Sequence, residues 1–257
     1  MQRELAPLFP MLAAQTRAEL VRLLRMPAFT VISIALPIMF YAFFGMPQAH
    51  AHYQLTTAGL YILGSFSAYA VLSIALFSFG ASVAAERGTG ATRLMRATPL
   101  RRSAYFFGKV VAALCFSAVA VTLLVLFAMV TNSAHPSLMM FAQLLGYLLL
   151  GCIPFIILGF AVGYIASINS AIAVLNLINL PLAFASGLFV PLPELPDWVR
   201  VIAPYLPTYH YGQLAWSAMG APAEPTLRSL IWLAGYAIVF LAVAMRAYHR
   251  DERKEFA

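Results

Sequence analysis

The chain has 257 residues, of which 62% are hydrophobic and 10% are charged, and its formal net charge is +7 at pH 7. A mean hydropathy of +0.84 excludes an ordinary soluble domain and predicts an integral membrane protein. The basic residues are not interleaved with aromatic residues in a polar context, so the positive charge does not indicate a nucleic-acid partner.

The first predicted element is an amphipathic helix over residues 8–26. At 100° per residue, the apolar side chains collect on one face and the charged ones on the other: Leu12, Thr16, Leu20, Leu23 and Leu24 against Arg17, Glu19, Arg22 and Arg25. This pattern predicts an interfacial helix that lies in the headgroup layer. A signal peptide is the alternative, because Ala49-His50-Ala51 is similar to a cleavage site, but the leading polar region is too long for one.

Six apolar segments are predicted to span the membrane, within a single domain of residues 1–257. About 20 residues at 1.5 Å each cover a 30 Å hydrocarbon core, so the longer segments must tilt, kink or protrude. Kinks are expected at Pro37, Pro154 and Pro181. The motif Gly159-x-x-x-Gly163 permits close contact between two helices. We favour a contact within one subunit over a contact at a dimer interface. The predicted spans are residues 28–46, 57–84, 103–131, 138–166, 170–190 and 227–247.

The loop between the second and third spans, residues 86–102, is the only long charged run inside the apolar sequence. Thr89 is a plausible N-cap for a short helix that ends before Pro99, and this helix would lie flat on the membrane surface. Its basic side chains are expected to reach water or acidic partners: Arg87, Arg93 and Arg96.

Basic residues also decide the predicted orientation. They gather in the N-terminal segment, in the 86–102 loop and in the tail from Arg246, whereas the loops at 47–56 and 132–137 contain no Lys or Arg. The positive-inside rule therefore predicts that both termini are cytoplasmic.

Residues 191–220 are too interrupted to form a smooth span. Asp197 can begin a short helix to Ala203, prolines break the chain, and a second short helix is expected from Tyr209 to Met219. We predict a re-entrant or outer-interface helical pair. The alternative, a seventh span, would place the basic tail outside.

No catalytic constellation is visible. The sequence has no phosphate-binding Gly-rich loop followed by Lys-Ser/Thr, so the chain is not expected to be an ATPase or another enzyme. His50 and His52 have no Cys or carboxylate near them, so no metal site is predicted. The span faces offer aromatic walls and a few hydrogen-bonding groups for a substrate path: Tyr41, Tyr69, Asn176 and Asn179.

Two stretches carry a family resemblance. Glu86-Arg87, Gly90, Met95-Arg96 and Thr98-Pro99-Leu100-Arg101-Arg102 resemble the coupling-helix region of the ATP-binding-cassette type-2 transporter permeases. The order Gly187-x-Phe189-x-Pro191, Leu195-Pro196-x-Trp198 and Leu206-Pro207-Thr208-Tyr209 is similar to the segment before the last span of that family. Gly88 and Arg93 stand where the family often has acidic residues.

The resemblance implies the transmembrane subunit of an ATP-driven exporter in a bacterial inner membrane. Two such subunits, a homodimer or a heterodimer, would meet largely through the first and fifth spans. Each would be driven by a cytoplasmic ATPase subunit that binds ATP and Mg, while this chain binds no cofactor. The residues expected to couple the two subunits, within 86–100, are Glu86, Arg87, Gly90, Leu94, Met95, Arg96, Pro99 and Leu100.

The substrate class is predicted from the span faces. Aromatic, weakly polar walls suit an amphiphile, such as a drug, a natural product, a lipid or a lipid-linked glycan. The alternative is a sodium extrusion permease or a gradient-driven carrier. That class generally needs ionisable residues at membrane depth, and the sequence offers only Lys109, near a span end.

Overall fold

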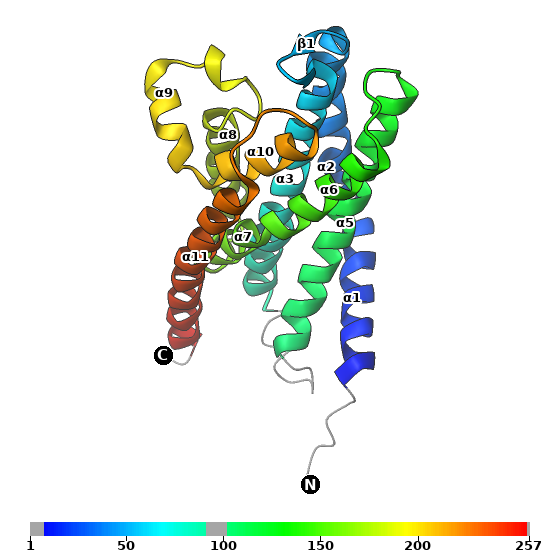
Figure 1. Cartoon of the computed structure of the whole chain (residues 1–257). Coiled ribbons are helices and arrows are strands. Elements are labelled where there is room, and N and C mark those ends of the chain that lie inside the picture. Colours follow the sequence, from blue (N-terminus) through cyan, green and yellow to red (C-terminus); the bar gives the residue numbers. More distant parts are fainter. Residues whose placement is uncertain (1–7, 91–101, 256–257) are drawn as a thin grey trace.

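The computed structural model describes residues 8–90 and 102–255 of the chain. Apart from a hairpin of two short strands, β1 (His52–Tyr53) and β2 (Thr56–Thr57), the regular structure of this part is helical, so the all-α prediction is confirmed. Figure 1 shows the start of α1 and the end of α11 at one end of the bundle and β1 at the other. The helices are α1 (Leu8–Leu24), α2 (Pro27–Phe40), α3 (Ala58–Gly88), α5 (Arg102–Val130), α6 (Leu138–Gly151), α7 (Ile153–Ile165), α8 (Ala171–Ala185), α9 (Asp197–Ile202), α10 (Pro207–Ala218) and α11 (Thr226–Glu255).

Five helical segments in the described residues are long and apolar enough to cross a membrane: Phe29–Gln48, Ala58–Gly88, Ser103–Val130, Leu138–Ile165 and Thr226–Asp251. They coincide with five of the six predicted spans. The predicted span at 170–190 is wrong in length, because α8 has 15 residues and covers only about 22 Å. The helix ends where Gly187 adopts a φ of +87° and the Leu188 N–H donates to the Ala183 carbonyl at 3.1 Å, a turn that glycine favours.

The three prolines of the predicted kinks behave differently. Pro154 lies in the first turn of α7, directly after the break at Cys152 between α6 and α7, so the kink predicted there is confirmed. Pro37 and Pro181 remain inside α2 and α8. After Pro37 the chain passes into a π-helical turn, Tyr41–Gly45, which extends the first span.

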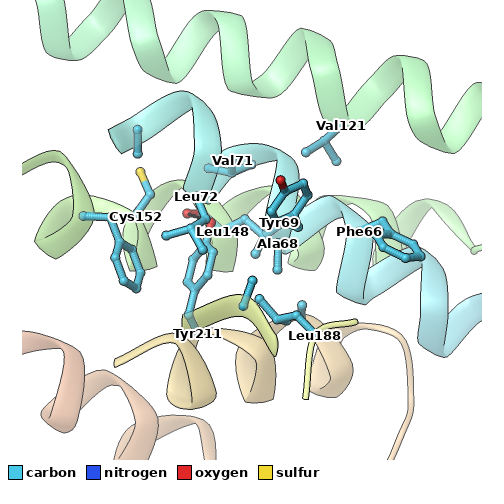
Figure 2. Packing of buried hydrophobic residues seen from close by; sticks show 14 of the residues in the cluster. Phe66, Ala68, Tyr69, Val71, Leu72, Val121, Leu148, Cys152, Leu188 and Tyr211 are labelled. Atoms are coloured by element: carbon cyan, nitrogen blue, oxygen red, sulfur yellow. Dashed lines mark hydrogen bonds between the residues drawn. The ribbon is translucent and has the colours of Figure 1, made fainter. Parts of the chain in front are cut away.

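Helix α3 is the centre of the bundle. Of its apolar part 78% is buried, against 17% for Phe29–Gln48 and 11% for α11. Figure 2 shows Phe66, Tyr69 and Leu72 of α3 among the side chains of the largest apolar cluster, together with Leu148 of α6 and Tyr211 of α10. The other helices therefore pack around α3.

Two glycines bring α7 onto α3. A Cβ atom at Gly159 would lie 2.9 Å from the carbonyl oxygen of Leu76, and one at Gly163 would lie 3.0 Å from that of Gly80. Only residues without a side chain permit this contact between backbones. The Gly159-x-x-x-Gly163 motif thus packs within one chain, which is the interpretation favoured from the sequence.

The segment before α11 forms two short helices, α9 and α10, where a helical pair was predicted. Helix α10 lies inside the bundle: the Trp216 Nε1–H donates to Ser65 Oγ of α3 at 2.8 Å, and the Tyr211 hydroxyl donates to the Leu148 carbonyl at 3.0 Å. At the β1 end, the Thr56 hydroxyl donates to the carbonyl of Met219 at 3.1 Å. Helix α10 is therefore an inner helix of the bundle and not a surface helix.

Helix α1 forms where predicted, but it packs along another helix, which was not predicted. Figure 1 shows α1 running lengthwise beside α5, whereas a helix in the headgroup layer would cross the spans. A Cβ at Gly108 of α5 would lie 2.6 Å from Cγ of Gln15, so the two helices are in close contact. Glu19, expected on a face toward water, is only 7% exposed.

The contact between α7 and α3 generates a first prediction. Gly159→Leu should lower the thermal unfolding midpoint of the detergent-purified chain by several degrees, because a side chain there overlaps the backbone of α3 at a cost of about 1 to 3 kcal/mol or more. Gly146→Leu on α6, where no atom lies within 4 Å of the added Cβ, is the matched control. Equal midpoints for the two variants would contradict the contact.

Candidate functional site

The last turn of α3 carries two adjacent charged residues, Glu86 and Arg87. Neighbouring helix positions point about 100° apart, so the two side chains reach different helices. Glu86 contacts α1 and α5, and Arg87 contacts α7 and α11. The end of α3 is thereby connected to four helices by charged groups.

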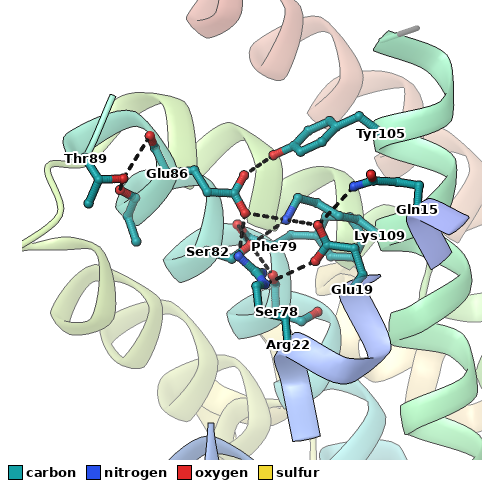
Figure 3. A network of polar contacts seen from close by, with 11 residues as sticks. Gln15, Glu19, Arg22, Ser78, Phe79, Ser82, Glu86, Thr89, Tyr105 and Lys109 are labelled. Carbon is teal, nitrogen blue, oxygen red and sulfur yellow. Dashed lines mark hydrogen bonds and ion pairs between the residues drawn. The ribbon is translucent and has the colours of Figure 1, made fainter. Parts of the chain in front are cut away.

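Glu86 is the centre of a polar network (Figure 3). The Lys109 ammonium lies 2.7 Å from Glu86 Oε1 and 3.0 Å from Glu19 Oε1. The Arg22 guanidinium and the Tyr105 hydroxyl both donate to the Glu86 carboxylate. The network thus contains two carboxylates, from α1 and α3, and two cations, from α1 and α5, so its charges sum to zero.

The burial of this network explains why its members must meet. Lys109 has 2% of its side chain exposed, Glu19 9% and Glu86 13%. An unpaired charge at such depth costs several kilocalories per mole, whereas a paired and hydrogen-bonded one is tolerated. Glu19 therefore faces inward, although the helical pattern of α1 assigns it to the charged face.

Arg87 makes the second set of contacts. Its Nε–H donates to Asp251 Oδ2 of α11 at 2.8 Å, and a further guanidinium nitrogen donates to Asp251 Oδ1, so the pair is bidentate. Its Nη1 donates to the Gly163 carbonyl at 2.8 Å, and its guanidinium lies 5.5 Å from the ring centre of Tyr164. Arg87 was expected to reach water or acidic partners, and the acidic residue that it meets, Asp251, belongs to this chain.

The first residues of the predicted coupling helix over 86–100 belong to another element. Glu86 and Arg87 still belong to α3, and Thr89 is the C-cap of that helix, with its hydroxyl donating to the Ala85 carbonyl at 3.0 Å. Thr89 thus ends α3, and Gly90 follows with a φ of +74°. The remaining predicted coupling residues, Leu94, Met95, Arg96, Pro99 and Leu100, lie outside the described residues.

Gly88 explains one departure from the family pattern. A Cβ atom there would lie 3.1 Å from Cβ of Ile168, in the turn between α7 and α8. An acidic side chain at this position would have to displace that turn. The missing carboxylate is therefore consistent with close packing in this chain.

The structure brings together only two of the four predicted substrate-path residues. Asn179 is 1% exposed and donates from Nδ2 to Ser73 Oγ at 3.0 Å, beside the Tyr69 hydroxyl. Asn176 is exposed and donates to the Ile172 carbonyl of its own helix. Tyr41 is buried elsewhere, with its hydroxyl 3.0 Å from Ser133 Oγ.

A second polar cluster, which sequence reasoning missed, lies near the start of α11. His210 of α10 is fully buried and stacks on Trp232 with 5.1 Å between ring centres. Its Nε2 is 3.0 Å from the Pro204 carbonyl, and its Nδ1 is 3.8 Å from Glu224 Oε2. Burial lowers the pKa of His210 below its usual value, although Glu224 opposes this shift and Arg228 adds to it. No spacing in the sequence points to this cluster, because its members come from separate turns.

In the described parts of the chain, no three or more His, Cys, Asp or Glu residues gather as a metal site would require. The charged clusters that the structure does show are ion pairs at the ends of helices.

Comparison with known proteins agrees with the resemblance found in the sequence. Residues 45–246 match the family model described as "ABC-2 family transporter protein". The chain is also similar to a Bacillus subtilis (strain 168) protein named "Putative transport permease YvfS", with 26% identity over 244 residues, which is 94% of this chain and 98% of that protein. Both matches include the end of α3 and helix α10.

The Glu86 network generates a stability prediction. Glu86→Gln should lower the free energy of unfolding, measured by titration into a denaturing detergent, by about 2 to 4 kcal/mol, because Lys109 stays buried with less negative charge around it. Asp197→Asn, which removes an ion pair whose carboxylate is 91% exposed, is the control and should cost less than about 1 kcal/mol. Adding Lys109→Met to Glu86→Gln should recover most of the loss. Equal small losses for both single variants would show that the network contributes nothing.

The His210 cluster predicts a pH dependence. Because folding lowers the pKa of His210, the neutral ring is the stable form, and its contribution is present above the unfolded value of 6.5 and declines as the pH falls below it. The thermal midpoint should therefore decrease between about pH 6.5 and pH 5. His210→Gln, whose amide can keep the bond to Pro204, should flatten this decrease. The control His135→Gln, at an exposed histidine, should leave it unchanged.

Proposed function

Since this chain belongs to the ABC-2 family of transporter proteins, we propose that it is the membrane subunit of an ATP-driven exporter. The ATP and its magnesium ion bind to a separate cytoplasmic ATPase, which engages residues 86–100. This chain supplies the membrane path and performs no chemistry itself. The observation that carries the proposal is the double attachment of the end of α3 through Glu86 and Arg87.

The attachment suggests how force could reach the spans. In the sequence, residues 91–101 lie between the end of α3 and the start of α5. Ion pairs buried at these helix ends resist separation, because an exposed break would leave a charge without its partner. A push on the 91–101 segment is therefore passed to α1 and α5 through Glu86 and to α7 and α11 through Arg87. Closure of the ATPases would tilt these helices together.

The orientation and assembly follow the same proposal. The start of α1, the end of α3 and the end of α11 share one end of the bundle, and the basic residues gather there, which favours cytoplasmic termini in a bacterial inner membrane. Helix α2 with the π-helical turn Tyr41–Gly45 that follows it, and helix α8, expose large apolar side chains, so a second permease subunit can meet these faces, in a homodimer or a heterodimer. The most exposed of these side chains are Val31, Ile32, Phe43, Ile172 and Leu177.

An amphiphile remains the substrate class that we propose. In the five described spans, Asp, Glu, Lys and Arg occur only toward the ends, at Glu86, Arg87, Lys109, Arg228, Arg246, Arg250 and Asp251. A sodium pathway at membrane depth would have to rely on amide, hydroxyl and carbonyl oxygens alone. Sodium extrusion or a gradient-driven carrier is therefore the second candidate, supported mainly by Asn179, whose Oδ1 has no hydrogen-bond partner among the described residues.

Coupling is tested by Met95→Asp in the complex with its ATPase, reconstituted in nanodiscs. We expect the variant to insert normally but to lose stimulation of ATP hydrolysis by amphiphiles, since a carboxylate replaces an apolar contact in the proposed interface. Leu55→Asp, at an exposed leucine in the loop of the β1 end, should keep the stimulation.

The same assay separates the two substrate classes. ATP hydrolysis would be measured with a panel of neutral and cationic amphiphiles, and with sodium chloride in place of potassium chloride. Stimulation by sodium but by no amphiphile would favour the ion permease. Normal stimulation in Met95→Asp would overturn the coupling role of residues 86–100.

A further inference from the structure

A recess lies where α7 and α11 end, next to the Arg87–Asp251 pair. Its volume is about 470 Å³, and Arg246 and Arg250 of α11 and Tyr164 of α7 contribute to its lining. The recess is therefore a built feature between two helices and not an isolated charge on a surface.

Its depth in the membrane follows from the length of α11. The helix begins at Thr226, and 20 residues at 1.5 Å span about 30 Å, the thickness of the hydrocarbon core, which brings the chain to Arg246. Arg250 is one turn, about 6 Å, further along. The two arginines thus lie at the level expected for lipid headgroups on the side of the chain termini.

The charges that face the recess are unbalanced. Arg87, Arg246 and Arg250 are cationic, and Asp251 is the only acidic residue of the lining. Asp251 is already held by Arg87 in a bidentate pair. Within the described residues no ion pair joins Arg246 or Arg250 to a carboxylate, and both side chains are exposed.

The wall toward the membrane is apolar. Val243, one turn before Arg246, is 39% exposed, and Ile165 at the end of α7 is 67% exposed. Both line the recess. An anion bound to the two arginines would therefore have apolar surface beside it, which suits an anion that carries an acyl chain better than a free phosphate ion.

From this combination we propose that the recess binds an anionic phospholipid. The lipid phosphate lies between Arg246 and Arg250, and the first methylene groups of an acyl chain lie against Val243 and Ile165. Tyr164 and the Arg87–Asp251 pair form the inner wall, so the lipid stabilises the end of α11 next to the α3 attachment. The proposal requires only a membrane-spanning chain and does not depend on an ATPase or on the direction of transport.

The test uses the full-length chain in nanodiscs made of equal parts phosphatidylglycerol and phosphatidylcholine. Lipids that remain bound are measured by native mass spectrometry after release from the disc. The wild type should retain phosphatidylglycerol in preference, and Arg246→Gln/Arg250→Gln should reduce that preference about tenfold, since two cations near the surface each attract an anionic headgroup. Both positions are exposed, so the variant should fold normally.

The matched control is Arg17→Gln/Arg25→Gln, which removes the same charge from exposed positions in α1 and in the turn directly after it, and should keep the preference. If both variants lose the preference for phosphatidylglycerol equally, the preference depends only on the net charge of the chain, and the proposed site is contradicted. Displacement of the lipid by millimolar inorganic phosphate would assign the recess to a free anion instead. If Arg246→Gln/Arg250→Gln retains the lipid but no longer co-purifies with the ATPase, the recess is a protein interface and the lipid proposal is contradicted.

Discussion

The structure depends on the pairing of charges at the buried end of α3. Glu86 and Arg87 are adjacent, yet each is satisfied by a different group of helices: Glu86 by Arg22 and Lys109, and Arg87 by Asp251 and the carbonyl of Gly163. Because a buried charge without a partner costs several kilocalories per mole, these contacts constrain how the helix ends can move relative to one another. Most contacts of the apolar spans above them are between apolar side chains, and such packing specifies direction more weakly than an ion pair does.

The position of α3 gives these contacts their importance. α3 is the most buried of the five spans, and glycines of α7 lie directly on its backbone. At the other end of the bundle, α10 is fixed to α3 through Trp216 and Ser65. Movement of α3 would therefore act at both ends of the bundle. This arrangement fits a permease that must convey a displacement from one side of the membrane to the other.

Much of the architecture follows from the sequence because hydropathy and helix breakers are local signals. Five spans, the break at Pro154 and the two short helices before the last span all depend on stretches of apolar residues and on proline. The length of the segment at 170–190 was overestimated, because the apolar run continues through the turn at Gly187, where hydropathy does not reveal that the helix has ended.

The sequence by itself determined that this is a helical membrane protein and which residues carry charge near the membrane. Only the tertiary structure decided how those charges are used. A periodicity plot places Glu19 with the other charged residues of α1, because it cannot include the neighbouring Lys109 of α5. The partner of Arg87, Asp251, is 164 positions away in the chain. The association of Tyr69 with Asn179, and the separation of Asn176 from both, likewise depend on how α8 is rotated against α3, which packing sets and no local pattern encodes.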